Sequence, residues 1–339
     1  MCFGVSHMKK TELWRNDIDF EVLEKIVSKR QAERSMSRYS SDVVKEIICP
    51  KIFLAGSATA LRVAVTSGVK PLNWLLSAGT YYKNGRFVMS DDFSKARLLG
   101  GLLFMDSGAQ QFFTKFDNKM DYPYNDKEYL EFALKAGVDY IATLDLPLDI
   151  LHPRGLPIMD GIKRTVEHGV ELIALAEDLG VSGKVVPVLQ GFDDPTQWLE
   201  SLDLYKSHGV TPDKYKYWGV GSICMMKSSS LVYKVLSAIR GAIPDAKLHV
   251  FGISMSSLKR VYHIINSYDT SVWVYHAKIN GRMLKWNPIR RSFIRINTNR
   301  TYDTKVLMKA NMLAILEMHQ DLCSDLISDN IDDFNIDVY

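Results

Sequence analysis

The segment LLFMDSGAQQFF (residues 102–113) sets the pattern on which the fold depends: a short apolar run ends at Asp106, and small and polar residues follow. The same break recurs in LDLPLD (144–149), VPVLQGF (186–192), YWGVGS (217–222) and HVFGIS (249–254). A second aspartate, Asp269, stands beside an apolar run in INSYDTSVWVY (265–275). Such runs are typical of buried parallel strands, whose carboxyl ends lie on one rim. We therefore expect these polar residues to meet at one edge of the fold.

Strand-like and helix-like segments alternate along the chain. Strand-like runs lie at 52–55, 74–78, 102–105, 138–144, 184–189, 215–220, 247–253 and 272–276. Helix-like segments between them include 125–137, 158–180 and 228–243. Apolar strands joined by amphipathic helices pair in parallel, because only the crossover helices can return the chain. About eight such units predict an α/β fold of the (β/α)8 TIM-barrel class, with a doubly wound open sheet as the alternative.

The chain is expected to form one domain over residues 1–339, since no linker-like, repetitive or low-complexity segment divides it. Residues 1–50 are predicted to be a helical extension, in which Val22, Leu23, Ile26 and Val27 recur at helix spacing. A closing helix is expected over 304–327, where a stripe of Met and Leu is typical of a core-facing surface.

The composition indicates a soluble protein with a large core, because hydrophobic residues make up 47% and charged residues 24% of the chain. No apolar run approaches the roughly 18 residues of a membrane span. The first ten residues, MCFGVSHMKK, lack the apolar region of a secretory signal. We expect a cytoplasmic protein without membrane contact.

The cysteines and histidines give no metal-site pattern. Cys2, Cys49, Cys224 and Cys323 are scattered, without the paired spacing of a zinc site or the density of a disulfide scaffold. The simplest interpretation is that all four are reduced thiols. The histidines are also dispersed, and no helical two-histidine motif occurs. We therefore expect no structural or catalytic metal.

Charge is distributed unevenly along the chain. The formal net charge is +3, but residues 318–339 carry six aspartates and no Lys or Arg, so the remainder carries 42 − 33 = +9. Residues 278–309 hold nine basic residues against one acid, Asp303. This segment suits a phosphate backbone, although a solvated face of mixed structure is an equal alternative. The acidic tail is either disordered or folded back on this basic surface.

Asp106 and Asp269 are the first candidates for catalysis. Asp106 is expected to leave a buried strand and enter a tight turn at Gly108, where backbone can approach a ligand. The plain structural alternative for either aspartate is a turn or cap residue that bonds its own backbone. Neither aspartate decides the matter alone.

The motifs DSGAQQ, LDLP, VLQG, VGS, HVFGIS and SYDTSVW occur in this order over about residues 50–275. The ordered set resembles the tRNA-guanine transglycosylase superfamily, especially its archaeal-type and DNA-modifying branches. That resemblance implies a (β/α)8 barrel and exchange of guanine for a 7-deazaguanine base, such as preQ0, at a nucleic-acid glycosidic bond.

The resemblance assigns Asp269 as the nucleophile that attacks C1′ of the sugar and Asp106 as the general acid/base. A carboxylate suits an oxocarbenium-like centre, and a covalent intermediate divides one hard displacement into two easier ones. The target base must also be unstacked before Asp269 can reach the sugar, so base flipping or single-stranded DNA is expected. The aromatic residues of 112–125 either hold the extruded base or simply pack this loop against the barrel.

The resemblance also implies a base-recognition set. Asp145 is matched to the carboxylate that accepts hydrogen bonds from guanine N1 and its amine, Gln190 to the side chain that reads O6, and Gly221 to an assisting backbone N–H. Ser107 and Gln111 are expected beside the base. Three of these residues also fit plain structural roles: Asp145 as a strand-end aspartate, Gln190 as a satisfied loop amide and Gly221 as part of a tight turn.

Two departures from the family pattern concern base stacking. Ala109-Gln110 replaces the usual Gly-aromatic pair, so the aromatic residue that commonly stacks on the base is missing. Phe251 falls where the family usually has methionine. We expect stacking to have moved to Phe251, with a gain of about 1 to 3 kcal/mol.

A third departure concerns zinc and the acceptor. The family's tRNA enzymes carry a Cys-x-Cys-x-x-Cys and histidine site beyond the nucleophile, where this chain has only Cys323. We therefore expect no zinc and no cofactor, and DNA as the acceptor. The expected docking residues are Lys278, Arg282, Lys285, Arg290, Arg291 and Arg295.

Other functions stay open on the sequence alone. They are the same exchange on tRNA, a non-catalytic relative that binds nucleic acid, and an unrelated barrel hydrolase that uses two carboxylates on a sugar. A homodimer or an accessory protein is also compatible with the sequence.

Overall fold

The computed structural model of this protein describes residues 49–114, 120–298 and 302–333. Its main sheet is parallel and runs in the order β7-β6-β5-β2-β1-β11-β10-β9-β8. These strands are β1 (Lys51–Ala55), β2 (Leu72–Ser77), β5 (Gly100–Asp106), β6 (Tyr140–Ala142), β7 (Val185–Val186), β8 (Val188–Leu189), β9 (Tyr217–Val220), β10 (Lys247–Val250) and β11 (Ser267–Thr270). The helical extension expected over residues 1–50 falls almost entirely outside the described residues.

The sheet closes on itself at Pro187. β7 pairs with β6 and β8 pairs with β9, and the two are successive parts of one segment. Proline has no N–H to give to the ladder, so it splits the strand into two short pieces. Its carbonyl still accepts from the N–H of Gly219 at 2.8 Å. Eight strand segments thus form a closed barrel, which confirms the predicted (β/α)8 class.

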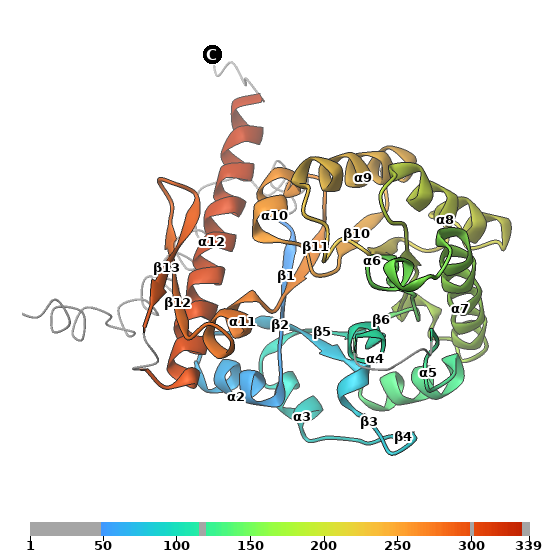
Figure 1. Cartoon of the computed structure of the whole chain (residues 1–339), viewed down its shortest axis with the longest axis horizontal. Helices are drawn as coiled ribbons and strands as arrows, with labels where there is room; N and C mark the ends of the chain where they lie inside the picture. Colours follow the sequence, from blue (N-terminus) through green and yellow to red (C-terminus); the bar gives the residue numbers. More distant parts are fainter. Residues whose placement is uncertain (1–48, 115–119, 299–301, 334–339) are drawn as a thin grey trace, which may run out of the picture.

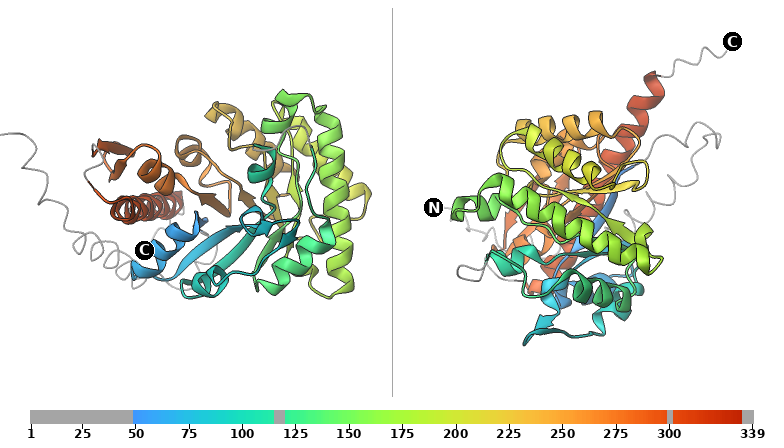
Figure 2. Two further views of the ribbon diagram at one scale, coloured as in Figure 1. Left: turned by 60° about the horizontal axis from the view of Figure 1, so that its bottom comes forward. Right: turned by 90° about the vertical axis from the view of Figure 1, so that its right-hand side faces the viewer.

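Helices cover the outside of the barrel, and additional helices and hairpins lie between its repeating units (Figures 1 and 2). The α-helices are α2 (Ala58–Thr66), α3 (Asp92–Arg97), α4 (Ala109–Phe113), α5 (Asp126–Lys135), α6 (Leu148–Leu151), α7 (Ile158–Asp178), α8 (Pro195–Ser207), α9 (Ser229–Ala242), α10 (Met255–Val261), α11 (Val272–Lys278) and α12 (Thr304–Asp333). Short 3-10 turns lie at Ala78–Thr80, His152–Arg154 and Ser182–Lys184, and a small hairpin at β3 (Tyr82–Lys83) and β4 (Arg86–Phe87).

The helices expected over 125–137, 158–180 and 228–243 are confirmed as α5, α7 and α9. Local sequence explains where α5 and α9 begin. The side chain of Asn125 accepts from the N–H of Glu128 and the Glu128 side chain accepts from Asn125, which makes a capping box at the start of α5. Ser228 caps α9 through the N–H of Leu231.

The prediction of a strand over 272–276 is wrong. The eighth strand is β11, and Val272–Lys278 forms helix α11. The run VWVY has the β-branched and aromatic composition of a strand, but Trp273, Val274 and Ala277 are buried at helix spacing, and α11 packs against α12. Asp269 therefore lies within a strand, opposite Phe53 of β1.

The closing helix is confirmed as α12. A two-stranded antiparallel hairpin, β12 (Arg282–Asn287) and β13 (Ser292–Asn297), packs against it, and both stand beside the barrel (Figure 1). None of the helices in the described part of the chain is long and apolar enough to span a bilayer.

Aromatic side chains fill the barrel interior. Phe53 and Phe104 meet edge to face with ring centroids 5.6 Å apart, and His249 lies 4.7 Å from Phe104 and 4.5 Å from Phe251. Tyr217 borders the same cluster. The interior is therefore a packed core beneath the rim.

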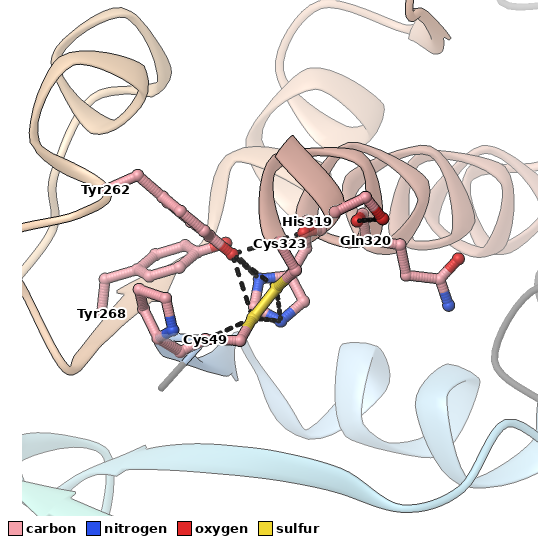
Figure 3. The surroundings of a disulfide bond; sticks show 8 residues. Cys49, Tyr262, Tyr268, His319, Gln320 and Cys323 are labelled. Atoms are coloured by element: carbon pink, nitrogen blue, oxygen red, sulfur yellow. Dashed lines mark hydrogen bonds between the residues drawn. A yellow bond between two sulfur atoms is a disulfide. The ribbon is translucent and has the colours of Figure 1, made fainter. Parts of the chain in front are cut away.

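The expectation that all cysteines are reduced is wrong for two of them. Cys49, just before β1, and Cys323, on α12, form a disulfide with their Cα atoms 5.4 Å apart (Figure 3). They are separated by 274 residues, so no local sequence spacing predicts that they pair. Among the described cysteines, Cys224 is free.

Candidate active site

A pocket opens at the carboxyl rim of the barrel, where side chains from several strand ends converge. The candidate residues among those that line it are Asp106, Ser107, Gln111, Asp145, Gly221, Phe251 and Asp269. Asp149 also lines the pocket. The described residues that line the pocket include no Lys or Arg. Four carboxyl groups without a basic neighbour favour a ligand that is rich in hydrogen-bond donors or develops positive charge.

Asp269 is buried at the end of the barrel interior, with 9% of its surface exposed. Its Oδ1 accepts a hydrogen bond from the N–H of Gly252 at 2.8 Å. Because alternate residues of a strand face opposite sides, Asp269 faces inward while Tyr268 faces the outer helices. The strand thus holds the carboxylate rigidly at the base of the pocket.

His249 lies directly beneath Asp269. Its Nε2 is 3.7 Å from Asp269 Oδ1 and, within the described residues, is buried without a hydrogen-bond partner. Its Nδ1 is 2.8 Å from Ser267 Oγ. Burial lowers the pKa of His249, against the opposing influence of Asp269, so the ring is neutral at neutral pH. No sequence pattern predicted this neighbour.

Asp106 ends β5 and enters the turn as expected. Gly108 has φ of 77°, a left-handed conformation that favours glycine, and a Cβ there would lie 2.3 Å from the backbone nitrogen of Gly79. The N–H of Gly108 donates to Asp106 Oδ1 at 2.7 Å. Asp106 therefore stabilises the turn and also lines the pocket.

The surroundings of Asp106 shift its protonation equilibrium into the neutral pH range. The pKa of Asp106 is raised to about 7, mainly by burial and in smaller part by the charges of Asp269 and Asp145, while polar contacts with Ser77 and Gly108 oppose this rise. A carboxyl group with this pKa can both give and take a proton at neutral pH.

Asp145 is held by two side chains. Ser107 Oγ donates to its Oδ1 at 2.7 Å, and Gln190 Nε2 donates to its Oδ2. Burial raises the pKa of Asp145 to about 6, against these two hydrogen bonds. The group faces the pocket with its orientation fixed by Ser107 and Gln190.

The structure places Gln190 differently from the expected base contact. Gln190 is fully buried and is not among the described residues that line the pocket. Its Nε2 is used by Asp145 and its Oε1 accepts from Ser222 Oγ. Both ends of the amide are engaged, so in this arrangement Gln190 positions Asp145 from behind.

The expected role of the Gly221 N–H also needs correction, because this group donates to the carbonyl of Leu189 at 2.9 Å as part of the sheet. Gly221 has a steric role instead. A Cβ there would lie 2.2 Å from Gln190 Nε2. Only glycine lets Gln190 reach Asp145 without displacement.

Gln111 and Phe251 reach the pocket from two different sides. Gln111 Oε1 accepts from Ser77 Oγ at 2.6 Å. The Phe251 ring meets Phe104 edge to face at 5.6 Å, so its position is fixed by the barrel core. Sequence reasoning missed Ser77 and Asp149, although Asp149 stands only four residues after Asp145 in LDLPLD.

The aromatic residues of 112–125 support the plain packing alternative. Phe112, Phe113, Tyr122 and Tyr124 are buried, and Phe116 lies outside the described residues. The hydroxyl of Tyr122 donates to the Asp145 carbonyl at 2.6 Å, and that of Tyr124 donates to the Ser107 carbonyl. These tyrosines brace the pocket wall.

The candidate docking residues do not share one face of the β12–β13 hairpin. Directly opposed residues of an antiparallel pair point to the same side, and Lys285 is opposite Ile294 whereas Arg295 is opposite Leu284. Arg282, two residues before Leu284, lies on the same side as Arg295. The pKa of His276 on α11 is lowered mainly by burial and to a smaller extent by the charges of Arg295 and Arg282. Arg290 lies exposed at the hairpin turn.

Part of the acidic tail does lie against this hairpin. Arg291 forms an ion pair with Asp325 at 2.9 Å, and Trp286 Nε1 donates to Asp321 at 2.6 Å. Lys278 is removed from the hairpin and donates to Ser57 at 2.8 Å.

Residues 123–289 match the model of the family described as DeoxyPurine in DNA protein A (DpdA). This range includes Asp145, Gln190, Gly221, Phe251 and Asp269, while Asp106 precedes it. A comparison with curated proteins finds no match. The resemblance to the tRNA-guanine transglycosylase superfamily is confirmed, and over residues 123–289 it is to the DNA 7-deazaguanine transglycosylase family.

Proposed function

We propose that this protein is a guanine transglycosylase, a pentosyltransferase that replaces guanine in DNA with a 7-deazaguanine base. The observation that carries the proposal is the convergence of Asp106, Asp145 and Asp269 on one acidic pocket at the barrel rim. The match of residues 123–289 to the DpdA family supports DNA as the substrate.

In the first half-reaction Asp269 attacks C1′ and the C1′–N9 bond breaks. The bonding electrons leave with guanine, and protonated Asp106 supplies the proton that guanine needs. In the second half-reaction N9 of the incoming base attacks C1′, its proton passes to Asp106, and Asp269 is released. Two inversions give net retention at C1′.

Asp145 is the proposed recognition group for the purine. Guanine and 7-deazaguanine share the N1–H and amino donors, which a carboxylate accepts well. Since Ser107 and Gln190 fix this group, a base that lacks these donors would leave a buried carboxylate unpaired and would bind poorly. Phe251 remains the proposed stacking surface, and guanine affinity unchanged in Phe251→Ala would count against it.

The acceptor is tested by exchange of labelled guanine into duplex DNA, single-stranded DNA and tRNA in parallel. Incorporation into DNA alone is the expected result. Incorporation into tRNA alone would select the alternative acceptor. No incorporation, with nucleic acid still bound, would favour a binding protein over an enzyme.

DNA docking is proposed for the Arg282 and Arg295 side of the hairpin, because this side borders α11, which begins directly after Asp269. Replacing both arginines with Ala should weaken DNA binding and lower the slope of log affinity against log salt by about 2. Lys285→Ala, on the opposite face, is the matched control and should change the slope less. Equal slopes in all three proteins would contradict this docking face.

A further inference from the structure

A second group of chemically competent side chains lies away from the pocket, between the start of β1 and helix α12. Cys49, His319 and Cys323 offer two sulfur atoms and one ring nitrogen that all lie within 4.8 Å of one another (Figure 3). Their positions are not those of a clustered Cys-x-Cys-x-x-Cys motif, since Cys49 precedes the first strand and the other two lie one helical turn apart.

The His319 ring turns one of its nitrogens, Nε2, toward the two sulfur atoms. Nε2 lies 4.0 Å from Cys49 Sγ and 3.8 Å from Cys323 Sγ. A tetrahedral Zn²⁺ has Zn–S of about 2.3 Å and Zn–N of about 2.0–2.1 Å, so its sulfur and nitrogen ligands are at most about 4.4 Å apart. Both observed nitrogen–sulfur separations lie within this limit, and reduction of the disulfide would let the two sulfur atoms part around a cation.

The other ring nitrogen is held by phenol groups. Nδ1 lies 2.7 Å from the hydroxyl of Tyr262 and 3.1 Å from that of Tyr268. A hydrogen bond at one ring nitrogen is how proteins orient a metal-binding imidazole and fix its tautomer.

The chemistry of the donor set is also appropriate. Two thiolates and a neutral imidazole are ligands that Zn²⁺ prefers, and the two negative charges balance the ion at this half-buried place. They supply three of four tetrahedral positions. Water would take the fourth position, because the Tyr262 hydroxyl is already engaged with His319 Nδ1 at 2.7 Å.

We propose that Cys49, His319 and Cys323 form a zinc-type metal site when the disulfide is reduced. Two thiols of a reductant would convert the disulfide into two cysteine thiols and leave as their own disulfide. Binding of the divalent cation would then displace the two thiol protons into solvent. Either cross-link joins the segment before β1 to α12 across 274 residues. The disulfide would hold them together in the oxidised protein, and the metal ion would do so in the reduced protein.

The test uses the full chain, reduced with a thiol, freed of reductant without air and titrated with Co²⁺ as a spectroscopic probe. The reduced protein should bind one Co²⁺ per chain with thiolate-to-metal absorption, and Zn²⁺ should displace it. The oxidised protein should show no such absorption. Reduced protein without this absorption would overturn the proposal, and that result needs no variant.

Variants then identify the ligands. Cys49→Ser and His319→Ala should each weaken Co²⁺ binding at least tenfold, whereas Cys224→Ser, which removes the free cysteine, should bind as the wild type does. Wild-type affinity in His319→Ala would show that the histidine only packs against a disulfide. These readouts do not depend on guanine exchange, so they stand or fall separately from the proposed function.

Discussion

Asp269→Asn is expected to abolish exchange of labelled guanine into DNA, with a loss of about 10⁴-fold or more, as for nucleophiles of other covalent enzymes. An amide cannot attack C1′ to give the covalent intermediate. Asn keeps an oxygen that can accept from the N–H of Gly252, now 2.8 Å from Asp269 Oδ1, so the fold should persist. Exchange rates at saturating DNA measure the effect.

The covalent step is checked by denaturing the protein with DNA in the absence of an incoming base. Wild-type protein should carry a DNA adduct that Asp269→Asn lacks. Asp149→Asn removes another carboxylate of the same pocket and is the matched control, which should still form the adduct. An adduct of undiminished yield in Asp269→Asn would place the nucleophile elsewhere.

Convergence of the carboxylates was predictable because barrel topology does most of the placement. Parallel strands put their carboxyl ends on one rim, so the breaks after 102–105 and in LDLPLD suffice to bring Asp106 and Asp145 together. The same reasoning misplaced the eighth strand, since VWVY has a strand-like composition and only its packing against α12 makes it helical. Asp269 still reached the rim, because β11 ends just after it.

Partners across the fold could not be predicted in this way. The role of Gln190 depends on Asp145, 45 residues away, and on Ser222, 32 residues away, which together occupy its amide. The bond between Cys49 and Cys323 and the position of His249 under Asp269 likewise arise from tertiary packing. Residue type suggested a chemistry for Gln190, but its hydrogen bonds assign it to positioning.

Asp106→Asn should reduce exchange by about 10²–10⁴-fold, the usual loss when a general acid/base is removed. Guanine would leave without a proton, and the incoming base would find no acceptor. In the wild type the release of guanine should slow as pH rises above about 7, because the pKa of Asp106 is about 7 and only its protonated form donates. Single-turnover release of guanine across pH measures this, and an identical pH profile in Asp106→Asn would contradict it.

The same substitution should stabilise the protein. The pKa of Asp106 is raised from 3.8 to about 7 by burial, so the folded state binds more protons than the unfolded state between those values. Wild-type stability must therefore fall as pH rises through this window, whereas Asn does not titrate. The advantage of Asp106→Asn should be small near pH 4, grow to about 4 kcal/mol and level off above about pH 7.

Urea unfolding of both proteins at several pH values measures the difference. Asn keeps an oxygen for the N–H of Gly108, 2.7 Å from Asp106 Oδ1, so the turn itself should contribute little. A stability difference that does not change with pH would mean that Asp106 is not held protonated by its surroundings. An inactive variant that is more stable than the wild type would instead show that the pocket keeps a carboxyl group there at a cost in stability, as expected for a group retained for proton transfer.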